Sequence, residues 1–348
     1  MKIPILTTLI IFLVGYCQPN RYETGHFPEK VVAFDEVNSV YDDYNSTAPF
    51  IYTNFLFHFS TNRESGGGQF DIAGDPLFID WNKTSGELQI GEEHNGDLFD
   101  YLEPLFDTVN TSADEFGPYS MGYREEVSDT ELHWIDLVLY ANNPEGHFDI
   151  RFTYSDKVNS NGASSTSIAS PAEINYINTP ADELYPSFFG EGLKFQDSYG
   201  VDTEKIKSIL YCSNIQGQFD LFTCDLPRSP GLIDALNSER LCEFEPIRHL
   251  NSKYQDLCPF VNGTLLVFCS NRYGGYGGFD LYYSQWEGEG WSEPNNFGES
   301  VNTRYDEFRP ITLHVRDFDN NLMIFSSNRP GGKGGFDLYY TGIPRMID

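Results

Sequence analysis

Pairs of acidic residues recur along this chain, each pair shortly after an Asn-Ser or Asn-Thr step and before an apolar run. If these pairs gather around one opening, their carboxylates can raise one another's pKa, recruit a divalent cation such as Ca²⁺, or bind a basic partner. We name them the acidic rim and treat them as a candidate binding site. Its members are Asp42, Asp43, Asp114, Glu115, Asp182, Glu183, Asp256, Asp306 and Glu307.

Three arginines follow the second apolar run of their segments and are expected on the same face as the acidic rim: Arg63, Arg272 and Arg329. A purely structural alternative is that the acids cap turn amides and pair with these arginines. Three segments carry the arginine whereas all five carry acids, so some carboxylates lack an evident partner. Both interpretations stay open. No other cofactor is expected, because the seven His are scattered and the Cys lack zinc-ligand spacing.

A second set of aspartates follows a Gly-rich turn and a Phe in each segment. Asp side chains at such positions accept hydrogen bonds from loop amides, so we assign them a structural role. Their spacings along the chain are 78, 71, 60 and 57 residues. The set is Asp71, Asp149, Asp220, Asp280 and Asp337.

These spacings require a repeated unit that positions the acids. Self-similar strand-turn-strand segments that follow one another along a chain are the signature of a radial array. We therefore expect an all-β, five-bladed β-propeller of four-stranded antiparallel blades. The last copy lacks a fourth strand, and the chain begins with a suitable one. Residues 30–34 should therefore complete the last blade beside residues 337–341 and remove its exposed edge.

The combined phrase, N-T-x-x-D-E-x-x-P followed by S-N-R-x-G-G-x-G-G-F-D-L-Y, resembles the TolB-type, WD-like propeller repeats of bacterial envelope proteins. The likeness is most specific in residues 325–332 and weakens in the second and third copies. It implies a propeller that binds other envelope macromolecules, usually without chemistry of its own. The resemblance to TolB implies six blades, whereas this chain carries five copies of the repeat.

The N-terminus predicts export. Lys2 precedes a short apolar stretch that ends near Cys17, where a lipoprotein would be cleaved and acylated, although Tyr16 is unusual before such a cysteine. Ordinary signal cleavage nearby is the alternative. We expect a signal peptide over residues 1–17, a tether over 18–26 and a single propeller over 27–348, located in the cell envelope as an outer-membrane lipoprotein. Disulfides are allowed there, but their pairing is open.

The composition and the motifs of the sequence narrow the range of possible functions. A net charge of −30 repels phosphate backbones, so nucleic-acid binding is excluded. Neither a G-x-S-x-G elbow nor an H-E-x-x-H motif is present. The acids repeat from copy to copy, which argues against separate acid and base roles. We therefore expect a non-catalytic module that binds an envelope protein or glycan. The alternative is a glycoside hydrolase-like five-bladed propeller with channel carboxylates.

Overall fold

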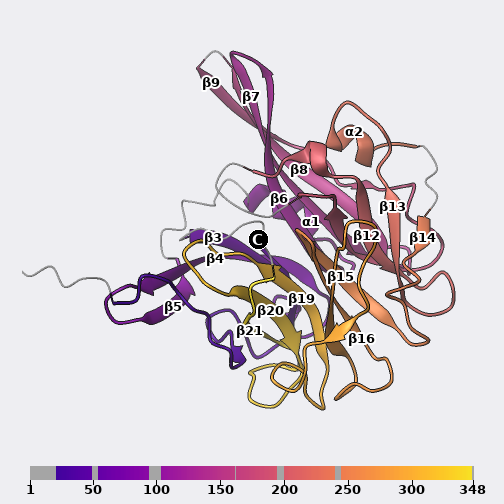
Figure 1. Ribbon diagram of the computed structural model, residues 1–348. Helices are drawn as coiled ribbons and strands as arrows, with labels where there is room; N and C mark the ends of the chain where they lie inside the picture. The colour runs from indigo at the N-terminus through magenta and orange to yellow at the C-terminus, as the bar shows by residue number, and fades with distance from the viewer. Residues whose placement is uncertain are drawn as a thin grey trace, which may run out of the picture.

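The computed structural model describes residues 21–48, 54–93, 103–160, 162–193, 200–239 and 244–346. These residues form five antiparallel sheets arranged around a common axis (Figure 1), which confirms the expected five-bladed propeller. The signal peptide and Cys17 lie outside the described residues. Within the described part, no helix is long and apolar enough to cross a bilayer.

Each blade is built from strands in which buried apolar residues of the repeated phrase form the core. The first two blades contain β2 (Asp43–Thr47), β3 (Asn54–Thr61), β4 (Asp71–Asn82) and β5 (Glu87–Glu92), then β6 (Glu115–Ser128), β7 (Glu131–Asn142), β8 (Asp149–Ser160), β9 (Ala163–Ile168) and β10 (Ala172–Glu173). In the second blade β9 and β10 both pair with β8, and the long β7, β8 and β9 extend beyond the ring (Figure 1).

The other three blades follow the same plan. Their strands are β11 (Glu183–Phe189), β12 (Ser208–Ser213), β13 (Asp220–Asp225) and β14 (Phe244–Pro246); β15 (Asp256–Asn262), β16 (Leu265–Ser270), β17 (Asp280–Gln285) and β18 (Asn295–Asn296); and β19 (Glu307–Leu313), β20 (Asn321–Ser327), β21 (Asp337–Ile343) and β1 (Val32–Ala33). Short helices lie in the connections: α1 (Glu103–Val109), η2 (Thr203–Lys205) and α2 (Leu232–Leu236).

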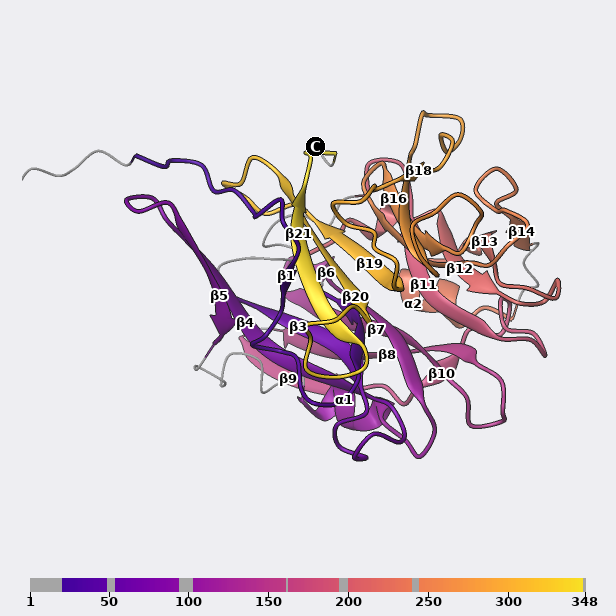
Figure 2. The ribbon, with the colours of Figure 1, turned by 90° about the horizontal axis from the view of Figure 1, so that it is seen from below.

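The first strands β2, β6, β11, β15 and β19 surround the axis, each in contact with the next, and β19 contacts β2 to complete the circle. The ring closes as the sequence predicts, because β1 pairs with β21 (Figure 2) through Val32 opposite Tyr340 and Ala33 opposite Tyr339. Asn38 strengthens this closure, since its side chain bonds both the N–H and the C=O of Leu338.

Four cysteines can be assigned as disulfide-bonded or free in the described part of the chain. Cys224 is disulfide-bonded, whereas Cys212, Cys258 and Cys269 are buried and free. Cys212 is therefore not bonded to Cys224, and Cys258 is not bonded to Cys269.

Candidate functional site

The first acid of each rim pair joins neighbouring blades. Its carboxylate accepts a hydrogen bond from the N–H of the Phe that precedes the third strand of the preceding blade in the ring, at 2.7 to 3.0 Å. It also accepts a bond from the Asn that ends the second strand of its own blade. The residues are Asp42, Asp114, Asp182 and Asp306, and Gln255 stands at this position in the fourth blade.

The second acid of each pair is fully buried at the start of a first strand. Three of the five pair with the predicted arginines: Arg63 with Asp43 at 2.7 Å, Arg272 with Asp256 at 2.5 Å, and Arg329 with Glu307 at 2.8 Å. Glu183 has no arginine but accepts bonds from Thr179 and Ser213. The structure therefore engages these carboxylates within their own blades.

The set of aspartates after the Gly-rich turn divides into two groups. Asp280 and Asp337 accept bonds from loop amides, such as the N–H of Tyr276 to Asp280 at 2.7 Å. Asp71 and Asp220 each accept a bond from the side chain of a Gln two residues earlier, and Asp149 lies 3.4 Å from His147. Burial raises the pKa of Asp71, Asp149 and Asp220.

A Ca²⁺ site at the acidic rim is not formed in the described part of the chain. There, no three His, Cys, Asp or Glu side chains gather closely enough to hold a metal ion. The physical reason is that the first acids bond amides at the junctions between blades, while most of the second acids bond hydroxyl or guanidinium groups within their own blades.

A different set of residues lines the axis. The third residue of every first strand is buried and has a positive φ between 45° and 59°, just before a shift in strand register. Positive φ costs free energy for residues other than Gly and tends to occur at functional sites. We call these the axial residues: Asn45, Gly117, Tyr185, Cys258 and Arg309.

Three axial side chains meet at the centre. The amide of Asn45 lies 3.4 Å from the hydroxyl of Tyr185, and the guanidinium of Arg309 lies 5.5 Å from the centre of the Tyr185 ring. Gly117 leaves room for this ring, since a Cβ there would approach Tyr185 Cδ1 to 2.3 Å. Unlike the rim acids, the axial residues differ in every blade, so they can serve separate roles.

Aromatic side chains surround the same end of the first strands. They come from the Phe before the third strand in four of the blades and from the second residue of three first strands, and all are partly exposed. Ring centres lie 5.1 Å apart for Phe70 and Phe116 and 5.4 Å apart for Phe279 and Phe308. This aromatic collar consists of Tyr44, Phe70, Phe116, Phe148, Phe279, Phe308 and Phe336.

Glu115 differs from the other first-strand acids, because Pro144 replaces the arginine and Asn142 replaces the hydroxyl residue. Its carboxyl group accepts a bond from Thr111 at 2.6 Å, while its Oε2 has no partner among the described residues. Burial, with a smaller contribution from the charge of Asp71, raises the pKa of Glu115 to about 7. Asp71 begins the third strand of the first blade, directly after Phe70. Glu115 begins the first strand of the second blade, directly before Phe116. We call Asp71 and Glu115 the acidic pair.

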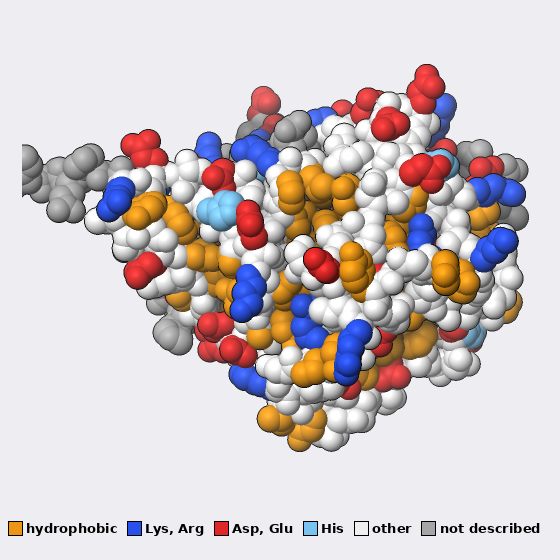
Figure 3. All heavy atoms as spheres, turned by 60° about the horizontal axis from the view of Figure 1, so that its bottom comes forward, with side chains coloured by type: hydrophobic (Ala, Val, Ile, Leu, Met, Phe, Trp, Pro, Cys, Tyr) orange, Lys and Arg blue, Asp and Glu red, His pale blue; other side chains and the backbone are white. Residues whose placement is uncertain are grey.

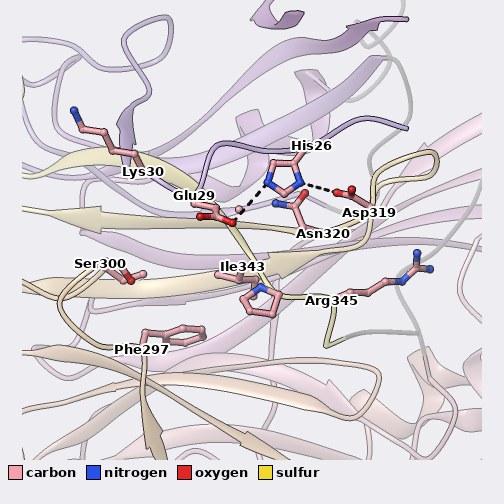
Figure 4. A pocket seen from close by; sticks show the side chains of 12 residues that line it. His26, Glu29, Lys30, Phe297, Ser300, Asp319, Asn320, Ile343 and Arg345 are labelled. Carbon is pink, nitrogen blue, oxygen red and sulfur yellow. Dashed lines mark hydrogen bonds and ion pairs between the residues drawn. The ribbon is translucent and has the colours of Figure 1, made fainter. Parts of the chain in front are cut away.

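A cleft of about 940 Å³ opens elsewhere, where the N-terminal segment meets the fifth blade (Figure 4). His26 lies at its upper edge in this view and pairs with Asp319 at 2.6 Å. Phe297 and Pro344 contribute apolar surface, and Arg345 extends to one side. None of the site residues predicted from the sequence lines this cleft.

Sequence reasoning missed the axial residues. The available signal was the residue directly before the Pro of the acidic phrase, which varies among Gly117, Tyr185, Cys258 and Arg309 while its surroundings repeat. The rim acids were selected from the sequence because they recur in every copy. The axial residues were missed because their residue type changes from copy to copy.

No protein-family model and no curated protein sequence matches this chain. Among solved structures, the fold resembles an exo-beta-1,3-galactanase from Clostridium thermocellum, at 12% identity and TM-score 0.44, over 90% of this chain and 62% of that one. It also resembles a glycosyl hydrolase from Bacteroides ovatus, at 9% identity and TM-score 0.44, over 91% and 88% of the two chains. A Trypanosoma rangeli sialidase matches at 8% identity and TM-score 0.34, over 90% and 57%.

The chain thus spans less than two thirds of the length of the galactanase and the sialidase. These solved structures are named as glycoside hydrolases and a sialidase. The expectation of a non-catalytic module, and with it the expectation that the chain is not an enzyme, is corrected: solved structures with a similar fold are named as glycoside hydrolases. The symmetry on which the expectation depended is broken at Glu115 and at the axial residues.

Proposed function

We propose that this propeller is a glycoside hydrolase-like enzyme that binds a glycan at the collar end of its axis. The observation that carries the proposal is the acidic pair, in which two copies of repeated carboxylates have lost bonds that their equivalents make. Glu115 lacks an arginine and has a free oxygen, and Asp71 accepts no loop amide of the kind that binds Asp280. Carboxylates with separate environments can take separate acid and base roles.

The collar supports sugar binding. Partly exposed aromatic rings offer flat apolar faces on which a sugar ring can stack, and polar groups around them fix its orientation. Phe70 and Phe116 lie directly beside Asp71 and Glu115 in the sequence, so a sugar on these rings is close to the acidic pair. Tyr254, Tyr273 and Tyr276 are 46%, 91% and 49% exposed on connections at the same end, which extends the stacking surface.

Glycosidic hydrolysis needs a protonated carboxyl group that gives its proton to the leaving oxygen and a second, ionised carboxylate that acts as base or nucleophile. Glu115 suits the first role, since its raised pKa of about 7 keeps a substantial fraction of it protonated near neutral pH. Asp71 is partly exposed and suits the second. Because Glu115 is fully buried, the turn over residues 110–115 has to shift for the proton to reach a substrate.

The test is release of reducing ends from a panel of plant and bacterial glycans. Glu115→Gln and Asp71→Asn should each lower kcat by about 10²-fold or more. Asp220→Asn is the matched control, because Asp220 has the same Gln partner as Asp71 but lies in the third blade; its kcat should stay within about twofold. Absence of turnover on every glycan, or full activity of Glu115→Gln, contradicts the proposal.

We also propose that the enzyme works in the cell envelope, on an envelope or imported glycan, tethered through Cys17. What supports this is the signal-like N-terminus and the resemblance of the repeat to TolB-type repeats of envelope proteins. The surface suits a soluble, tethered domain: acidic and basic side chains are interspersed on the face in Figure 3. Incorporation of labelled palmitate into the wild type and not into Cys17→Ser supports the tether, and equal labelling contradicts it.

A further inference from the structure

Arg309 is a buried charge without a counter-ion. The residue is 0% exposed, and among the described residues its guanidinium donates to two backbone carbonyls, that of Pro259 at 3.3 Å and that of Pro118 at 3.2 Å. Its Nε has no partner among the described residues. No carboxylate of the described part pairs with it, in contrast to Arg63, Arg272 and Arg329.

The neighbouring groups do not supply a negative charge. Burial raises the pKa of Cys258, Cys212 and Tyr185 well above neutral pH, so the thiols and the phenol stay uncharged. Burial of a cation without a paired anion is unfavourable, because the Coulomb attraction that would offset its lost hydration is missing. An unsatisfied buried polar group in a native protein calls for an explanation, and a functional role is one of them.

We propose that Arg309, with Asn45 and Tyr185, binds the carboxylate of an acidic sugar, so that the substrate of the proposed hydrolase is a uronic-acid glycan. The inference rests on the proposed function where it calls the acidic sugar a substrate. The anion site itself is argued from the contacts of Arg309 alone. Guanidinium, amide and phenol groups together supply donors to a carboxylate, and a guanidinium fits it through two parallel bonds. The collar then holds the adjoining sugar rings.

Access passes Tyr185. It is 5% exposed, while Arg309, Cys258 and Asn45 are fully buried, and its ring lies against the guanidinium of Arg309. A ligand that reaches Arg309 has to displace this ring. The backbone at Tyr185 already has a positive φ of 57°, which is a strained conformation that a shift of the strand can relieve.

The experiment compares three probes on the purified protein: oligogalacturonate, a neutral galacto-oligosaccharide of equal length, and acetate. We expect oligogalacturonate to bind at least about tenfold more tightly than the neutral sugar, since a charge-assisted hydrogen bond contributes about 1.5–3 kcal/mol. Arg309→Met should remove this preference, and Arg309→Lys should keep part of it. Equal binding of acetate and oligogalacturonate would reduce the site to one for a free anion and overturn the sugar assignment.

Folding of the variant provides the second readout. A ligand-binding arginine without an internal counter-ion should not stabilise the free protein, so Arg309→Met should melt at or above the wild-type temperature. A much lower melting temperature for both Arg309→Met and Arg309→Lys would show that Arg309 is structural and overturn the inference.

The two proposals fail separately. Cleavage of neutral glycans only, dependent on Glu115, would leave the proposed function and overturn the acidic-sugar assignment. Binding of oligogalacturonate that depends on Arg309, without cleavage of any glycan, would leave the anion site and overturn the hydrolase.

Discussion

Glu115 and Asn142 face each other across β6 and β7, and each has one buried oxygen without a hydrogen-bond partner among the described residues. The side chain of Asn142 favours the ionised form of Glu115 and by itself lowers the pKa of this carboxyl group, but burial outweighs that effect. Burial of the carboxyl group therefore raises the pKa of Glu115 from 4.5 to about 7.

The first prediction concerns stability against pH. The folded state holds the Glu115 proton more tightly than the unfolded chain, so the stabilisation is complete below about pH 4.5 and is lost as pH rises through 7. The shift corresponds to about 3 kcal/mol. Other buried carboxyl groups, such as Asp136, contribute with the same sign. The measurement is therefore the difference between wild type and Glu115→Gln in urea unfolding from pH 4.5 to 8. Parallel pH profiles for the two proteins would contradict the prediction.

The second prediction concerns the arginine-carboxylate pairs. Arg272 donates to Asp256, which is fully buried. Arg272→Met leaves that carboxylate buried without its cation, so we expect a loss of about 3–5 kcal/mol in the free energy of unfolding. Arg304→Met is the control: its guanidinium contacts only the ring and hydroxyl of the adjacent Tyr305, and a loss below about 0.5 kcal/mol is expected. A loss under 1 kcal/mol for Arg272→Met would show that the pair adds nothing.

The third prediction concerns ring closure. Asn38→Ala leaves a buried N–H and C=O of Leu338 without their side-chain partner, at an expected cost of about 2–4 kcal/mol. Deletion of residues 28–37 should abolish cooperative unfolding, because it removes β1 and exposes the edge of β21. Asn295→Ala, at an exposed position, should change stability by less than about 0.5 kcal/mol. Unchanged melting of the deletion variant would mean that the ring does not need its clasp.

The fold was readable from the sequence because propeller geometry repeats. Each Gly-rich turn, Asn and Asp recurs in register, and the missing fourth strand of the last copy pointed to residues 30–34. The site was harder to read because it depends on exceptions. Pro after Tyr185, Cys258 and Arg309 predicts extended backbone, yet these residues have positive φ. The register shift that turns them toward the axis depends on contacts among five strands, which no local pattern encodes.

The last prediction tests the packing at the axis. Gly117→Ala places a Cβ 2.3 Å from Tyr185 Cδ1 at a φ of +58°, so backbone strain of about 1–2 kcal/mol adds to overpacking of about 1–3 kcal/mol. Gly146→Ala is the matched control, because its φ is +93° with no atom within 4 Å, and only the strain should appear. Adding Tyr185→Ala to Gly117→Ala removes the atom that clashes. A double-mutant cycle in urea should then show a favourable coupling of about 1–3 kcal/mol between the two changes. Strictly additive effects would mean that the Tyr185 ring does not pack across Gly117, and its proposed place in the path to Arg309 would lose its basis.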